Sequence, residues 1–169
     1  MIGEATVDLD PGFTVVTGET GAGKTMVVTA LGLLLGARAD AGAVRRGSSR
    51  AVVDAGVRVT ADHAALRLAQ EAGAVVDEGD NGTHDLVLSR SVTASGDGTR
   101  SRATAGGRSV PVGLLSEIGA TLVAVHGQND QLRLLRPGEQ RAARNSGRSG
   151  FSGAGIRLDD SSGRQHHRF

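Results

Sequence analysis

A glycine-rich stretch near the amino terminus, Gly18 to Thr25, fits the phosphate-binding pattern G-x-x-x-x-G-K-[ST] at every fixed position. The residues before it, 13–17, are β-branched and apolar like a buried strand, and residues 26–35 are apolar and long enough for a helix. This order of strand, loop and helix separates a true phosphate loop from a chance glycine-rich turn. The sequence therefore predicts an α/β fold of the P-loop NTPase class.

The residue types in this loop fit a nucleotide phosphate. Glycines let successive backbone N–H groups approach phosphate oxygens where a side chain would block them. Lys24 is placed to reach the β- and γ-phosphates, and the Thr25 hydroxyl is a ligand for Mg²⁺. The expected nucleotide-binding residues are Gly18, Glu19, Thr20, Gly21, Ala22, Gly23, Lys24 and Thr25.

Lys24 is also the only lysine in the chain, and every other side chain with a permanent positive charge is arginine. A broad, planar guanidinium cannot replace a compact ammonium inside a phosphate cradle. The exception at position 24 therefore supports the nucleotide interpretation.

Composition excludes several other classes of protein. The chain has no cysteine, which rules out disulfides and cysteine-ligated zinc. Its first residues show no signal peptide, and its longest apolar run, residues 26–35, is too short to span a bilayer. We expect a soluble cytoplasmic protein with no membrane partner.

The front of the chain alternates between strand and helix patterns, whereas the pattern disappears after Pro137. We expect a lobe over residues 1–136 and an Arg/Gly/Ser-rich, disordered tail over residues 137–169. Asp62 is the expected cap of the first helix after the P-loop helix. The expected strands are 5–9, 13–17, 51–59, 85–92, 100–105 and 121–125, and the expected helices are 26–35, 63–72 and a segment from Pro111 to about Gly119.

Four stretches together resemble the N-terminal head segment of the RecN family, DNA double-strand-break repair ATPases of the SMC-like ABC class. They are residues 13–39, Arg45-Arg46-Gly47, residues 101–103 with Gly106-Gly107, and residues 122–128. The resemblance implies an ABC/SMC-type head N-terminal lobe, incomplete here, with a mixed sheet and helices. It also implies ATP and Mg²⁺ as cofactors, DNA as a partner of the complete protein, and a nucleoid-associated location.

The same resemblance implies two further site residues. Gln128 stands where ABC-type heads place the Q-loop glutamine, a catalytic residue that helps hold Mg²⁺ and the attacking water, with Gln131 as a nearby competitor. Arg45 corresponds to the arginine that SMC-like heads place near the γ-phosphate. The alternatives are a polar residue capping a strand end and a solvated loop arginine.

The family pattern is incomplete in this sequence. ABC heads also need a Walker B aspartate, a catalytic glutamate and a signature motif, supplied in part by a C-terminal head lobe or second head. The nearest imitation of Walker B, residues 74–78, is better explained as a hairpin edge. We hypothesise that the chain is a truncated or frameshifted product that cannot hydrolyse ATP alone. Heptad-rich sequence in another frame after codon 140 would support this hypothesis.

Two other function classes remain open. A self-sufficient small P-loop kinase or NTPase would need a carboxylate in the chain, with Asp54, Asp77 and Glu78 as the candidates. A non-enzymatic DNA-binding protein would use the arginine-rich tail, which brings no tyrosine or tryptophan for base stacking.

Overall fold

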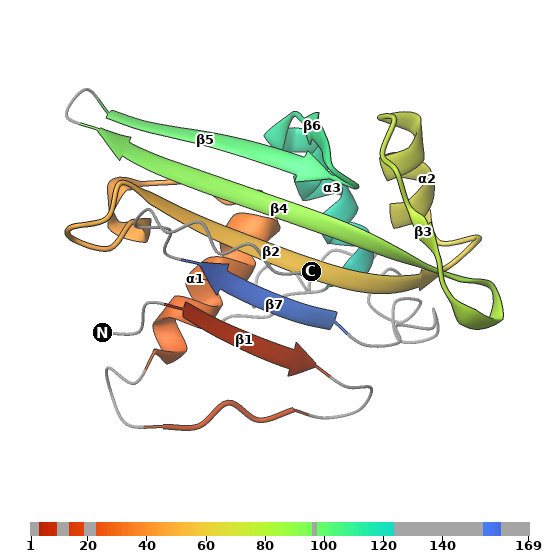
Figure 1. Ribbon diagram of the computed structural model, residues 1–169, viewed down its shortest axis with the longest axis horizontal. Helices are drawn as coiled ribbons and strands as arrows, with labels where there is room; N and C mark the ends of the chain where they lie inside the picture. The colour runs from red at the N-terminus through yellow and green to blue at the C-terminus, as the bar shows by residue number, and fades with distance from the viewer. Residues whose placement is uncertain (1–3, 10–13, 19–22, 96–97, 124–153, 160–169) are drawn as a thin grey trace, which may run out of the picture.

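The computed structural model describes residues 4–9, 14–18, 23–95, 98–123 and 154–159. A seven-stranded sheet forms the framework, with the strand order β1-β7-β2-β4-β5-β6 and β3 beside β4 (Figure 1). The strands are β1 (Glu4–Leu9), β2 (Arg50–Thr60), β3 (Asp77–Glu78), β4 (Thr83–Ser95), β5 (Gly98–Ala105), β6 (Arg108–Val110) and β7 (Ala154–Asp159). Neighbouring strands pair antiparallel throughout this set.

Two long strands, β2 and β4, form the centre of the sheet. They pair over their whole length, from Arg50 opposite Thr93 to Thr60 opposite Thr83. Alternate residues along both strands are buried, as expected for a sheet with one covered face. The covered face carries the buried side chains Val53, Ala55, Val57, Val59, Leu86, Leu88 and Val92.

Three α-helices pack on that covered face: α1 (Lys24–Leu34), α2 (Ala64–Glu71) and α3 (Val112–Leu122). Figure 1 shows α1 and α3 behind the sheet. A Cβ on Gly119 of α3 would lie 2.7 Å from the Leu35 side chain, so the small residue permits close contact between α3 and the end of α1. Two short 3-10 helices, η1 (Ala41–Ala43) and η2 (Asp80–Gly82), complete the described elements. The expected α/β sheet with helices is confirmed.

The fold corrects the predicted tail. Residues 154–159, expected to be disordered, form β7, which lies between β1 and β2 and pairs with both. Val7 of β1 is thereby opposite Ile156, which is in turn opposite Ala55 of β2. Ile156 and Leu158 alternate with Arg157 and Asp159, so a short period-two strand pattern is present in this part of the tail.

The predicted strand over residues 13–17 is also wrong in its described part. Residues 14–17 have no regular structure, and Val15 and Val16 are 61% and 51% exposed. An apolar, β-branched segment becomes a buried strand only where neighbouring strands offer it hydrogen bonds and a covered face. None of the described strands pairs with this segment.

Two smaller predictions about helix ends are wrong. Asp62 does not cap α2; His63 does, its Nδ1 accepting a hydrogen bond of 3.1 Å from the Ala65 N–H. Asp62 instead accepts a 2.6 Å hydrogen bond from the Thr60 hydroxyl. Thr121 and Leu122, expected to begin a strand, are the last residues of α3, while residues 124–125 lie outside the described residues.

Candidate functional site

The described part of the phosphate loop consists of Gly18, the N-cap Gly23 and the first residues of α1, Lys24 and Thr25. Gly23 is the N-cap and has a left-handed backbone conformation, with φ of 90° and ψ of −3°, which residues with a Cβ rarely adopt. Its carbonyl oxygen accepts hydrogen bonds from the N–H groups of Met26 at 3.0 Å and Val27 at 3.2 Å. The chain therefore turns sharply at Gly23 and enters the helix at the motif lysine.

Lys24 bends back toward the start of the loop, where its Nζ donates a hydrogen bond to the carbonyl oxygen of Gly18. This contact joins the first and seventh positions of the motif, so the loop is closed at its base. Lys24 is half-buried and Thr25 is exposed. Glu19, Thr20, Gly21 and Ala22 lie outside the described residues.

This arrangement places positive charge where an anion can bind. The N-terminus of an α-helix carries a partial positive charge and presents free N–H groups, and α1 is eleven residues long. The Lys24 ammonium lies at the same end and is the compact donor that contacts a phosphate oxygen most readily. The Thr25 hydroxyl, the expected Mg²⁺ ligand, is open to solvent beside it.

The other expected site residues are less completely placed. Arg45 is exposed in the turn after η1, where its carbonyl oxygen accepts a 3.0 Å hydrogen bond from the Ser48 N–H. Gln128 and its competitor Gln131 lie outside the described residues. No group of three or more His, Cys, Asp or Glu side chains within the described ranges is arranged to hold a metal ion.

The candidate carboxylates lie on two strands of the sheet, β2 and β3. Asp77 and Glu78 are exposed in β3, which pairs with β4 opposite Asp85 and His84. This edge strand agrees with the hairpin interpretation of residues 74–78 and not with a buried Walker B strand. Asp54 is half-buried in β2 opposite Ser89.

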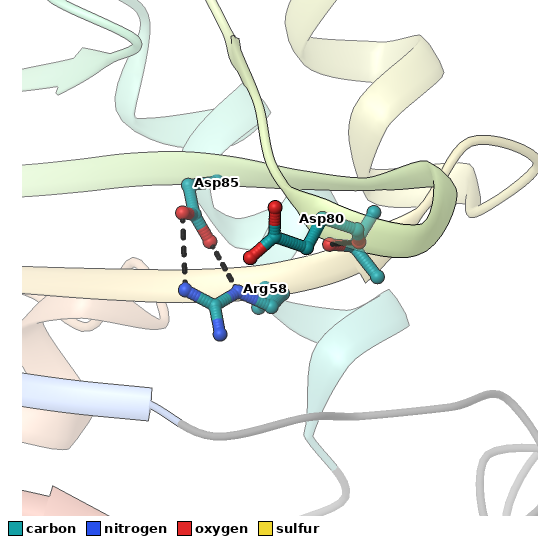
Figure 2. Close-up of polar contacts among 4 residues, drawn as sticks. Arg58, Asp80 and Asp85 are labelled. Atoms are coloured by element: carbon teal, nitrogen blue, oxygen red, sulfur yellow. Dashed lines mark hydrogen bonds and ion pairs between the residues drawn. The ribbon is translucent and has the colours of Figure 1, made fainter.

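An ion pair marks the outer face of the sheet near the β3–β4 turn (Figure 2). Arg58 donates hydrogen bonds of 2.8 Å and 3.2 Å to the two carboxylate oxygens of Asp85. This hydrogen bond raises the pKa of Arg58, to which Asp80 contributes through its charge, and lowers the pKa of Asp85. Both side chains are almost half exposed, so the pair fixes local geometry more than it stabilises the fold.

Sequence reading missed one buried cation, Arg90 on the covered face of β4. Its side chain is 2% exposed; Nη2 donates a 3.0 Å hydrogen bond to the Ser101 hydroxyl, while Nε and Nη1 have no partner among the described residues. Burial lowers the pKa of this guanidinium. The sequence did contain a signal for this burial, because Arg90 alternates in step with Leu88 and Val92, both of which face the core.

The sequence was compared with models of known protein families. A family model described as "AAA domain" matches residues 2–131, which is most of the chain. The chain belongs to the AAA domain family. Of the context expected for the phosphate loop, the helix after it is present as α1, whereas residues 14–17 before it have no regular structure.

The curated relatives of this AAA domain chain carry the name DNA repair protein RecN. The protein of Streptomyces coelicolor is 57% identical over 143 residues, and that of Mycobacterium leprae is 51% identical over 144 residues. These alignments cover 85% and 84% of this chain, and 24% of each relative. The relative from Halalkalibacterium halodurans is 41% identical over 135 residues, covering 80% of this chain and 22% of its own length.

The predicted resemblance to the RecN family is therefore confirmed. The chain spans about a quarter of the length of the curated relatives it matches. No solved structure matches the fold. Among the described helices, none combines the length and apolar character needed to cross a membrane.

Proposed function

We propose that this chain is the ATP-binding lobe of a RecN-type ATPase that acts in DNA double-strand-break repair and recombination in the cytoplasm, at the nucleoid. The observation that carries the proposal is the closed base of the phosphate loop, where Lys24 contacts Gly18 at the start of α1. The names of the relatives support the repair role, and the AAA domain match supports ATP as the ligand.

In this proposal the loop residues bind the triphosphate. Backbone N–H groups of Gly18 to Gly23 and the α1 N-terminus receive the phosphate oxygens, Lys24 neutralises the β- and γ-phosphates, and Thr25 ligates Mg²⁺. Gln128 would share the Mg²⁺ and orient water, and Arg45 would approach the γ-phosphate. A second head or C-terminal lobe supplies the remaining catalytic groups, so the 169 residues bind MgATP without turning it over.

The test is binding of a fluorescent ATP analogue to the purified full chain in the presence of Mg²⁺, together with a steady-state phosphate-release assay. We expect saturable binding that Lys24→Ala abolishes and that Lys24→Arg weakens strongly, because a guanidinium does not fit the cradle. Arg67→Ala, a change at an exposed cation on α2, is the matched control and leaves binding unchanged.

Two results would contradict the proposal. Equal nucleotide binding by the wild type and Lys24→Ala removes the phosphate-loop assignment. Steady ATP hydrolysis by the wild-type chain that is lost in Lys24→Ala refutes the need for a second lobe and favours a self-sufficient NTPase.

A further inference from the structure

The strands β1 and β2 do not pair with each other in the sheet. Each pairs antiparallel with β7, which lies between them (Figure 1). Because both are antiparallel to β7, β1 and β2 run in the same direction, about 10 Å apart, which is twice the spacing of paired strands. The gap between them, here named the strand slot, has main-chain donors and acceptors on both walls and takes one extended segment.

The segment that fills the strand slot comes from a distant part of the chain. The AAA domain model covers residues 2–131, which include both walls of the slot but not β7. Residues 124–153 connect Val123, at the end of α3, to β7. A connection of this length spans at most about 100 Å, so it is long enough for β7 to reach the slot of another copy. The two-residue turn Gly106-Gly107, by contrast, confines β6 to the β5 of its own chain.

The attachment of β7 depends on its two neighbours. Among the described elements, its principal contacts are with β1 and β2. An antiparallel ladder recognises the direction and register of a strand through main-chain groups, and not the chain to which that strand belongs. In this register Ile156 is opposite Val7 on one side and Ala55 on the other. Residues 154–159 of a second copy have the same sequence and make the same two ladders.

Exchange of β7 between copies therefore loses no strand pairing. An empty slot would leave two unpaired strand edges within the sheet, and β1 pairs with no described strand other than β7. The strand of the same chain and the strand of a second copy both complete the sheet. When two copies exchange β7 reciprocally, both slots are filled and the contact closes as a dimer.

We propose that the strand slot is a docking site between two copies of this chain, and that its occupant in the dimer is residues 154–159 of the second copy. The monomer keeps β7 in its own slot and prevails at low protein concentration, whereas the dimer gains by mass action. The inference does not rest on the proposed nucleotide function, because none of the proposed nucleotide-binding residues lies on β1, β2 or β7.

The test is disulfide cross-linking, to which the chain is suited because it contains no cysteine. Thr6 of β1 and Arg157 of β7 are register partners. Residues opposite each other in an antiparallel pair have Cα atoms about 4.5–5.5 Å apart, within the range of a disulfide. The full-length variants Thr6→Cys and Arg157→Cys are unfolded together in urea, refolded at several concentrations without nucleotide, and oxidised. A disulfide between positions 6 and 157, identified by mass spectrometry, then joins two copies.

We expect this disulfide to increase with protein concentration. While the monomer prevails, a tenfold rise in concentration raises the ratio of dimer to monomer about tenfold. The matched control mixes Arg157→Cys with Thr99→Cys, a change at an exposed threonine of β5, which does not adjoin β7 in the sheet. This control measures the disulfides that form by random collision.

Two further variants test the same inference independently. The double variant Thr6→Cys, Arg157→Cys forms one disulfide within a chain when β7 is in its own slot, and two disulfides between chains when β7 is exchanged. Ile156→Pro removes a main-chain donor from the middle of a central strand, so it should abolish the wild-type dimer in size-exclusion chromatography with light scattering. Far-UV circular dichroism checks that each variant is folded.

Four results would overturn the inference. In the mixture, the disulfide between positions 6 and 157 could be no more abundant than the collision control. The double variant could be linked only within single chains at every concentration, or could form no disulfide between these positions. A wild-type dimer could persist unchanged in Ile156→Pro, which would place the interface elsewhere. Failure of ATP binding in its own assay would refute the nucleotide function and leave these measurements unaffected.

Discussion

The hairpin between β5 and β6 allows a prediction with an internal control. Its two-residue turn is Gly106-Gly107, with φ of 51° and 74°, as in the primed turns that suit a twisted hairpin. A Cβ on Gly107 would meet nothing within 4 Å, whereas a Cβ on Gly106 would lie 2.2 Å from the Val75 carbonyl oxygen and 2.9 Å from its nitrogen. Only the first position is crowded by backbone.

The two alanine substitutions should therefore differ in cost. Gly107→Ala carries only the left-handed backbone penalty of about 1–2 kcal/mol. Gly106→Ala carries the same penalty and also displaces Val75, whose N–H donates a 3.2 Å hydrogen bond to the Gly106 carbonyl. Losing that bond and repacking the segment adds about 2 kcal/mol, giving a total of about 3–4 kcal/mol.

The assay is urea unfolding of both variants followed by far-UV circular dichroism, because the chain has no tryptophan for fluorescence. A difference of about 2 kcal/mol between the variants corresponds to about 4–8 °C in Tm for a chain of this size. Equal free energies of unfolding for Gly106→Ala and Gly107→Ala would refute the packing argument, since backbone conformation alone would then explain both.

Two further predictions concern the buried cation Arg90 and the helix cap His63. Arg90→Met is expected to raise the free energy of unfolding by about 1–3 kcal/mol in urea titration, since it removes a buried group with unmatched donors; a loss of stability would show that Arg90 has a strong partner. Burial holds the pKa of His63 below its ordinary value, so the unfolded chain takes up a proton first as pH falls from about 7, and stability decreases. His63→Asn, which keeps a capping acceptor, should flatten the melting temperature between pH 7.5 and 5.5 relative to the wild type; an unchanged slope would exclude His63 as its source.

Local patterns predicted the parts of the fold that depend on local physics. The alternation in residues 51–59 and 85–92 predicted β2 and β4, whose covered faces carry the apolar residues. The apolar run 26–35 predicted α1, which begins two residues earlier, at Lys24, and ends at Leu34. The sequence predicted Asp62 as the cap because aspartate has the stronger intrinsic preference for this position. In the structure the helix begins one residue later, so His63 occupies the N-cap.

The remaining differences come from distant partners. Residues 14–17 have the composition of a buried strand, but no described strand pairs with them; residues 154–159 have a short alternating pattern and pair with two described strands. A local pattern does not decide which of the two segments joins the sheet, because hydrogen-bond partners in a sheet are chosen across the whole chain. The family resemblance succeeded for the opposite reason: it rests on short motifs whose chemistry is local.

The position of β7 has a consequence for how the protein is made. Ribosomes deliver β1 long before residues 154–159, so Glu4 waits about 150 positions of synthesis for Asp159, its register partner. Contacts this remote raise the entropic cost of the folding barrier and slow its crossing. Until residues 154–159 emerge, the edges of β1 and β2 stay open to strands of other nascent chains, so this strand order increases the need for chaperones.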